Sequence, residues 1–223
     1  MSKYNFTLDI NDGSSASLIL QKIKPNSKVL EFGSAHGRMT KYMKEQLNCN
    51  VVIVEQDIDA GSEALQFADA NYNFVGSDIE DFSWKTLPKD FDYIIFADVL
   101  EHLYDPEKVL MEAKEFIKDK GSVLISIPNI AHNAVIIDLL NNNFEYRNLG
   151  LCDNTHIRFF TYKTLKSMIK RCGFKIKEMQ DTRVEPEHTE FNNSYDNLPA
   201  EVVDFLKKKP YGNVYQFIWE LIK

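Results

Sequence analysis

Four apolar runs in this chain of 223 residues carry an acidic residue at or near their ends. The acids are Glu31 in the run 28–32, Glu55 in 50–56, Asp78 in 72–78 and Asp98 in 91–99. Glu31 is followed by a short glycine loop, and Glu55 lies farther along the chain. A carboxylate about 20 residues beyond such a loop can accept hydrogen bonds from both ribose hydroxyls of an adenosine. The spacing therefore predicts a site for a ligand that contains a nucleoside.

The glycine loop, within VLEFGSAHGRM (29–39), distinguishes between three kinds of nucleotide site. A dinucleotide fingerprint needs G-x-G-x-x-G, but Ala35 and Arg38 stand where the second and third glycines belong. A Walker A loop needs G-K-[ST] after its second glycine, which Gly37 does not provide. The remaining pattern is E-x-G-x-x-x-G, in which backbone amides and a helix N-terminus approach the ligand. A tight turn between a strand and a helix is the alternative without a ligand.

The elements that would position these acids alternate between strand and helix. We predict strands at 28–32, 50–56, 72–78, 91–99 and 122–128, and helices at 37–47, 59–69 and 105–121. In the last helix, Asp105 suits the N-cap, Pro106 the first turn and Gly121 the stop. Such alternation predicts a parallel sheet with helices on both faces.

After residue 128 the pattern changes. We expect a helix at 130–143, irregular structure at 144–160, a helix at 161–173, a strand at 174–180, a helix at 198–209 and a strand at 214–222. The last strand reaches the sheet by antiparallel pairing. The whole chain, 1–223, is predicted to be a single domain. Its additions are an N-terminal helical segment (1–26), a cap (129–160) and an insertion before the last strand (182–212).

The loop and the segment FDYIIFADVLEHLYDP (91–106) resemble class I S-adenosylmethionine-dependent methyltransferases. Their motif I is written E/D-x-G-x-G-x-G, from which this chain departs at Ala35 and His36. The resemblance covers roughly residues 27–173. It implies an α/β, Rossmann-like, doubly wound sheet of seven strands, mostly parallel, with only the 214–222 strand reversed. It also implies S-adenosylmethionine as the cofactor.

The same resemblance assigns cofactor roles by position. The implied cofactor-binding residues are Glu31, Gly33, Ser34, Ala35, Gly37, Glu55, Gln56, Asp78, Ile79 and Asp98. Glu31 and Gly33 would meet the methionine part and Glu55 the ribose hydroxyls. Asp78 would accept from the adenine amino group, with Ile79 packed on the ring, and Asp98 would lie near the methyl group. The alternative for Asp78 and Asp98 is a turn or a helix cap.

Two further stretches, SIPNIAHNAV (126–135) and DNTHIRFFT (153–161), resemble small-molecule and sugar-associated methyltransferases of bacteria. They would wall the acceptor site, with candidates His132, Asp153, His156, Arg158 and Phe159. We expect His156, Asp98 and Arg158 to be the catalytic residues, with His156 as a general base. The alternative is that hydrogen bonds from these side chains hold an irregular loop together.

The sequence DVLEH places Asp98, Glu101 and His102 at the spacing D-x-x-E-H. It resembles the E-x-x-E-H of some RNA-terminal and quinone O-methyltransferases, which bind a divalent ion there. Aspartate is one methylene shorter than glutamate, and the pair EH also occurs in members without metal. We therefore expect no metal at this position, and structural roles for Glu101 and His102.

Composition limits the partners. A net charge of −7 and a pI near 5.3 disfavour nucleic-acid binding, which needs clustered lysine and arginine. No run approaches the roughly 18 apolar residues of a membrane span, and the N-terminal residues contain no apolar signal region. The three cysteines, Cys49, Cys152 and Cys172, form no CxxC pair. We expect a cytoplasmic monomer or homodimer without membrane contact.

The predicted function is methyl transfer from S-adenosylmethionine to a small hydroxyl- or amine-bearing metabolite or sugar. An alternative is an inactive protein that binds the cofactor as a sensor or scaffold, which the changes at Ala35 and His36 would fit. A nicotinamide oxidoreductase is disfavoured because the G-x-G-x-x-G spacing is missing.

Overall fold

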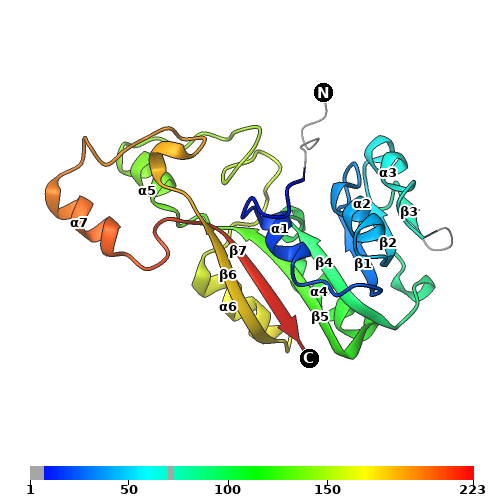
Figure 1. The fold of residues 1–223 in the computed structure, drawn as a ribbon. Helices are drawn as coiled ribbons and strands as arrows, with labels where there is room; N and C mark the ends of the chain where they lie inside the picture. Colours follow the sequence, from blue (N-terminus) through cyan, green and yellow to red (C-terminus); the bar gives the residue numbers. More distant parts are fainter. Residues whose placement is uncertain (1–7, 70–72) are drawn as a thin grey trace.

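A seven-stranded sheet in the order β3-β2-β1-β4-β5-β7-β6 forms the centre of the computed structural model (Figure 1), which describes residues 8–69 and 73–223. The strands are β1 (Lys28–Phe32), β2 (Asn50–Glu55), β3 (Phe74–Val75), β4 (Phe91–Ala97), β5 (Ile117–Pro128), β6 (Lys175–Arg183) and β7 (Val214–Ile222). Strands β1 to β5 pair in parallel, whereas β7 runs antiparallel to both of its neighbours, β5 and β6. The predicted fold class, including the single reversed strand, is confirmed.

Both faces of the sheet are covered because its central strands are apolar on both sides. On one face, side chains such as Val29 and Ile95 pack with α1 (Ser15–Leu20), α2 (Arg38–Glu45) and α3 (Ile58–Ala64). On the other face, side chains such as Leu30 and Phe96 pack with α4 (Pro106–Phe116) and α6 (Tyr162–Arg171). Neighbouring residues of one strand thus point into opposite halves of the core.

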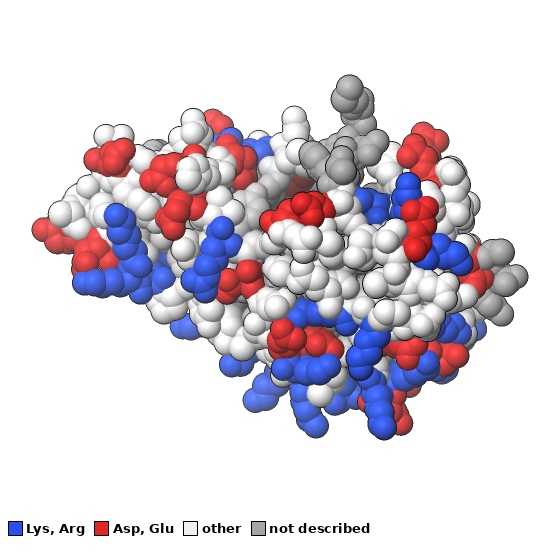
Figure 2. Space-filling model, viewed as in Figure 1, with Lys and Arg blue, Asp and Glu red and all other residues white. Residues whose placement is uncertain are grey.

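Two helices lie away from the sheet. Helices α5 (Asn133–Leu140) and α7 (Ala200–Lys208) are together at one end of the molecule, and α2 and α3 are at the other (Figure 1). Many lysine and arginine side chains on the viewed face line the lower margin, where β7 ends (Figure 2). That margin is opposite the carboxyl ends of the parallel strands. None of the helices in the described ranges is long and apolar enough to cross a membrane.

The 129–160 segment leaves the sheet and returns to the same place. Asn129, which follows β5, forms a parallel bridge with Phe160, and the amide of Ile130 donates to the Phe160 carbonyl. The segment is therefore a closed excursion from the carboxyl end of β5. The helix predicted at 130–143 is present as α5, which is shorter than predicted.

The predicted end of the helix at Gly121 is wrong. Helix α4 ends at Phe116 and β5 begins at the next residue, so Gly121 lies inside a strand. A Cβ atom at Gly121 would lie 2.8 Å from the carbonyl oxygen of Asp92 on β4. This glycine therefore allows two strands to approach closely, a role that Gly can have inside a sheet.

The strand predicted at 72–78 is also shorter in the structure. Only Phe74 and Val75 form β3, and Gly76 follows with a φ of 77°. Residues 70–72 lie outside the described ranges, as do residues 1–7 of the predicted N-terminal helical segment, whose described part contains α1.

Helix α6 offers a test of local stability. The hydroxyl of Thr161 accepts from the amide of Thr164, and the Thr164 hydroxyl accepts in return from the Thr161 amide. We expect Thr161→Ala to lower the free energy of unfolding by about 1 kcal/mol, because it removes one half of this capping box. Urea denaturation measures the change. Lys163→Ala, at an exposed position of the same helix, is the control and should leave stability nearly unchanged; an equal loss in both variants would contradict the capping role.

Candidate active site

The predicted acids of three strands meet at the carboxyl edge of the sheet. Strand β1 lies between β2 and β4, with Phe32 in register with Val54 and Phe96. Glu55 and the residues after Phe32 and Phe96 therefore share one level at this edge. This is the place where ligands bind in open α/β sheets.

The glycine loop connects β1 to α2 through left-handed backbone. Gly33, Ala35 and Gly37 have φ values of 68°, 46° and 75°. A Cβ at Gly33 would lie 2.7 Å from a Val99 methyl, and one at Gly37 would lie 2.6 Å from the Ala64 Cα. A side chain at either position would clash with its neighbours, so both positions require glycine. Ala35 occupies a conformation that costs an L-residue with a side chain roughly 1–2 kcal/mol.

Glu55 joins the glycine loop to the loop after β2. Its buried carboxylate accepts from the Ala35 amide at 2.7 Å through Oε2 and from the Asp57 amide at 2.9 Å through Oε1. Each carboxylate oxygen can accept a further hydrogen bond, so hydroxyls of a ligand could still be bound. The left-handed Ala35 is stabilised by this contact, which links the loop motif directly to the acid predicted to hold the ribose.

Glu31 is buried beneath the glycine loop. Its Oε2 accepts from the hydroxyl of Thr40 on α2 at 2.6 Å. Burial raises the pKa of Glu31 to about 7, against a lowering by the Thr40 hydrogen bond, and the negative charge of Glu55 adds to the increase. Thr40 is a contact of Glu31 that the sequence pattern does not indicate.

Ser34 is the second residue of the glycine loop and is 5% exposed. Its Oγ has no hydrogen-bond partner among the described residues. A buried hydroxyl without a partner is costly, so a bound ligand that supplies one would be favoured here. Together with the Glu55 carboxylate and the glycine loop, it gives a set of groups that fits a nucleoside-containing cofactor.

The predicted adenine contacts lie farther out. Asp78 is exposed, and its Oδ1 accepts from the Glu80 amide at 2.8 Å, as a turn-forming aspartate does. Ile79 is half-buried and packs against the core, and Gln56 is exposed. Asp78 therefore forms a turn, as the alternative predicted. Its Oδ2 could still accept a hydrogen bond from a ligand, so the adenine role stays a prediction.

Asp98 follows β4 with a φ of 54°. Its Oδ1 accepts from Ser126 Oγ on β5 and from Gln216 Nε2 on β7, both at 2.8 Å. Burial raises the pKa of Asp98, while these two donors oppose the increase. Ser126 and Gln216 are not predicted from the sequence. The sequence does contain one indication of Gln216, which is a polar residue inside the apolar strand VYQFIWELI (214–222). Because β7 runs antiparallel to β5, the start of β7 lies beside the carboxyl end of β5.

Glu101, His102 and His156 come together beside Asp98. Glu101 and His102 belong to a short 3₁₀ helix, η2 (Leu100–His102), and the Glu101 carbonyl accepts from the amides of Ile157 and Arg158. His156 Nε2 lies 4.0 Å from Glu101 Oε1. Burial raises the pKa of Glu101 well above its ordinary value, and the charge of Asp98 adds to this. The 129–160 segment is thus fixed over the end of β4.

The other acceptor-site candidates have separate positions. His132 is fully buried at the N-cap of α5, where its Nδ1 accepts from the Ala134 amide and its Nε2 contacts the Val184 carbonyl at 2.8 Å. Asp153 accepts from the amide and the hydroxyl of Thr155. These contacts give His132 and Asp153 structural roles within the segment.

Arg158 donates to the Tyr104 carbonyl at 3.2 Å and 2.5 Å. Its side chain and Phe159 line a cavity of about 440 Å³ between the start of α4 and α6. The structure therefore brings His156 to η2 and places the Arg158 guanidinium in this adjacent cavity.

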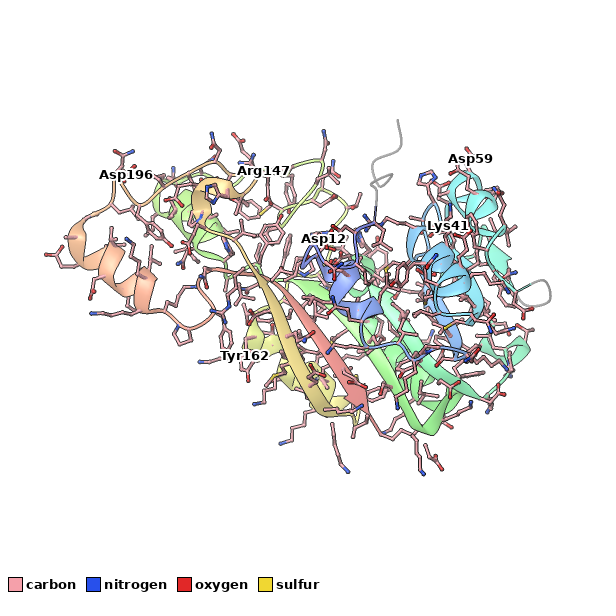
Figure 3. All side chains as sticks on the ribbon, viewed as in Figure 1. Asp12, Lys41, Asp59, Arg147, Tyr162 and Asp196 are labelled. Carbon is pink, nitrogen blue, oxygen red and sulfur yellow. The ribbon has the colours of Figure 1, made fainter. Side chains whose placement is uncertain are left out.

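Glu190 ties the 129–160 segment to the 182–212 segment. Its carboxylate accepts from the Leu151 amide at 2.7 Å and from the Tyr215 hydroxyl at 2.8 Å, and its carbonyl accepts from Arg147 at 3.0 Å. Figure 3 shows Arg147 and Asp196 at the end of the molecule that holds α5 and α7. The two segments thus form one connected wall beyond β5 and β7.

Comparisons with known proteins agree with this geometry. Residues 14–178 match a family model described as a methyltransferase domain. The phosphoethanolamine N-methyltransferase of Triticum aestivum is 32% identical over 108 residues, which cover 48% of this chain and only 21% of that enzyme. The ubiquinone biosynthesis O-methyltransferase of Paraburkholderia phymatum is 25% identical over 175 residues, covering 76% of this chain and 73% of that enzyme.

Solved structures share the fold. An S-adenosylmethionine-dependent methyltransferase from Archaeoglobus fulgidus superposes with a TM-score of 0.62 at 18% identity, covering 95% of each chain. A TehB-like S-adenosylmethionine-dependent methyltransferase from Corynebacterium glutamicum gives a TM-score of 0.59 at 15% identity and covers 96% of this chain and 89% of its own.

The Glu31 pKa predicts a pH dependence of stability. Because the folded protein holds the Glu31 proton up to a pKa of about 7 and the unfolded chain releases it near 4.5, stability falls as pH rises between these values. We expect Glu31→Gln to remove up to about 3 kcal/mol of this fall, from 2.5 pKa units at 1.36 kcal/mol each. Urea denaturation from pH 4.5 to 7.5 measures it.

The control is Glu45→Gln, at an exposed position of α2. It should reproduce the wild-type pH dependence. A Glu31→Gln curve parallel to the wild-type curve would refute the raised pKa.

Proposed function

Because the chain belongs to the family of S-adenosylmethionine-dependent methyltransferases, we propose that it methylates a small hydroxyl- or amine-bearing metabolite or sugar. The observation that carries the proposal is the arrangement at one edge of the sheet. The glycine loop and Glu55 lie after β1 and β2, and Asp98 lies after β4 against the 129–160 segment. The groups proposed for the cofactor and those proposed for the acceptor are thus neighbours.

The cofactor supplies an electrophilic methyl group on a positively charged sulfur. Glu55 would hold its ribose hydroxyls, and the Ser34 hydroxyl and Glu31 would meet its methionine part. Burial raises the pKa of the Glu31 and Asp98 carboxyl groups, and a positive sulfur beside them favours their ionised, attractive forms. These residues bind and orient the methyl donor.

Transfer requires the acceptor atom to lie in line with the methyl group. His156 Nδ1 contacts the Leu151 carbonyl at 3.4 Å, and since a carbonyl only accepts, Nδ1 carries the proton of that bond. Nε2 then carries the lone pair and lies 4.0 Å from Glu101 Oε1. In this proposal it takes the proton of a hydroxyl acceptor, a step that an amine acceptor does not need.

The acceptor class is supported by the relatives and by sequence. The named relatives methylate at nitrogen in one case and at oxygen in the other. The stretches 126–135 and 153–161 support a small-molecule or sugar-associated acceptor. The closed 129–160 segment is compatible with a small acceptor because it covers the edge of the sheet.

A second candidate is a protein that binds the cofactor without turnover. The observation in its favour is the glycine loop, in which Ala35 holds a left-handed conformation and His36 Nδ1 contacts Glu63 at 2.8 Å. Incubation with methyl-labelled S-adenosylmethionine and a panel of hydroxyl and amine acceptors separates the two functions. Labelled product supports the enzyme, and tight binding without product with any acceptor supports the sensor.

Glu55 tests the cofactor site. We expect Glu55→Gln to weaken S-adenosylmethionine binding by about 1–3 kcal/mol, because paired hydroxyls lose a charged acceptor while one amide contact can persist. Calorimetry gives the affinity and circular dichroism checks the fold. Glu63→Gln, beside the loop at an exposed position, is the control and should bind as the wild type does. An unchanged affinity in Glu55→Gln would count against the ribose role.

Turnover tests the acceptor side. We expect His156→Ala to reduce turnover about 100-fold or more, and Arg158→Ala to reduce it clearly, with little change in cofactor affinity. Arg171→Ala is the control, since Arg171 lines the same cavity as Arg158 but pairs with Glu107 on α4. Wild-type turnover in both test variants, or a loss of cofactor binding instead, would refute this acceptor-site assignment.

A further inference from the structure

A second cavity lies at the end of the molecule that holds α5 and α7. Its walls come from the first residue of α5, the end of β6, the C-terminal part of α7 and the turn 209–213, which connects α7 to β7. Its volume is about 640 Å³, within the roughly 300–1,000 Å³ of small-molecule sites. No residue that lines it is one of the proposed cofactor-binding or catalytic residues. The proposed methyl transfer therefore does not account for this cavity.

Asn133 lines this cavity and is 2% exposed. Its Nδ2 donates to the Tyr195 hydroxyl at 2.9 Å and to the Leu206 carbonyl at 3.1 Å. A carbonyl only accepts, so Nδ2 must lie on that side, and Oδ1 has no hydrogen-bond partner among the described residues. A Cβ at Gly212 would lie 2.8 Å from Oδ1, so only glycine backbone covers this oxygen. A buried acceptor without a donor is costly, and a ligand hydroxyl would remove that cost.

Lys209 brings a half-buried positive charge to the same cavity. Its Nζ donates to the carbonyl of Ala131, but an ammonium group has three donors, so two remain for a ligand. Burial lowers the pKa of Lys209, and no carboxylate opposes this effect. A charge that is partly removed from water and has no counter-ion is unfavourable, so an anion in the cavity would stabilise it.

The other charges around the cavity are also mainly positive, in a chain whose net charge is −7. Three cationic side chains line it, those of Arg183, Lys207 and Lys209, against the single carboxylate of Glu185. Arg183 is paired with Asp181 at 2.7 Å, whereas the two lysines form no ion pair among the described residues. Two ammonium groups suit a phosphate monoester, which carries close to two negative charges at pH 7. Glu185 would repel the phosphate but can accept hydrogen bonds from hydroxyl groups.

We propose that this cavity binds a sugar phosphate, at a site separate from the edge where methyl transfer takes place. The phosphate group lies between Lys207 and Lys209, and the sugar hydroxyls donate to Glu185 and to Asn133 Oδ1. A small shift of the turn 209–213 admits a hydroxyl to Oδ1, because glycine alone covers it. Inorganic phosphate would leave Asn133 without a donor, and a neutral sugar would leave Lys209 without an anion. The cavity therefore needs both parts in one ligand.

The test is calorimetric titration with glucose 6-phosphate and ribose 5-phosphate, with the neutral sugars glucose and ribose, and with inorganic phosphate. We expect one sugar phosphate per chain for at least one of the two compounds. Inorganic phosphate should bind about 10-fold more weakly or worse, and the neutral sugars should give no measurable binding. Lys209→Gln and Lys207→Gln should each weaken sugar phosphate binding about 10-fold or more, because each removes a charged hydrogen bond. Lys208→Gln is the matched control and should bind as the wild type does, since this neighbouring lysine pairs with Asp204 and does not line the cavity.

Binding of neither sugar phosphate would overturn the site. Equal affinities for inorganic phosphate and the sugar phosphates would mean an adventitious ion only, and an equal loss in all three lysine variants, folded by circular dichroism, would mean unspecific attraction. Saturation with S-adenosylmethionine should leave sugar phosphate affinity unchanged. Displacement by the cofactor, or transfer of labelled methyl to the sugar, would place the ligand at the edge of the sheet and refute a separate site. Cofactor affinity is measured on the same samples, so a failure of this site leaves the proposed function standing.

Discussion

Four carboxyl groups, of which three are buried and that of Asp98 is half-buried, lie at one edge of the sheet, and the site depends on how they are accommodated there. Each group is stabilised in a different way: Glu55 by two backbone amides, Glu31 by a threonine hydroxyl, and Asp98 by a serine and a glutamine. Glu101 has no such hydrogen bond among the described residues. Burial raises the pKa of Glu31, Asp98 and Glu101, and a positive charge nearby favours their ionised forms, so the edge suits a cofactor whose reactive sulfur is positive.

The same constraint explains why distant parts of the chain converge there. Strand β7 must run against β5 to bring Gln216 to Asp98, and the 129–160 segment must return to β5 to bring His156 to Glu101. Glu190 then connects that segment to the next one. This edge with its four carboxyl groups is thus enclosed by backbone and side chains that come from late in the sequence.

Local patterns predict much of this fold but less of the site. Apolar runs with polar boundaries give the bounds of β1 and β7. The end of α4 is not predictable in this way, because residues 118–121 are polar and their strand depends on the close approach of Gly121 to β4. Glycine spacing and strand-end acids locate Gly33 and Glu55 at the site edge. The left-handed Ala35, the donors to Asp98 and the meeting of His102 with His156 depend on tertiary contacts that no local pattern encodes.

The position of β7 between β5 and β6 has a consequence for the nascent chain. Strand β6 is synthesised first, yet its only strand neighbour in the sheet is β7. Until residues 214–222 have left the ribosome, β6 has no place in the sheet and one side of β5 remains an open edge, which is prone to wrong pairing. The time needed to translate 184–213 is therefore a window in which a chaperone on the exposed β5 edge would protect the chain. Pairing of β7 with β5 also brings Gln216 to Asp98, so closure of the sheet and completion of the hydrogen bonds to Asp98 depend on the same strand.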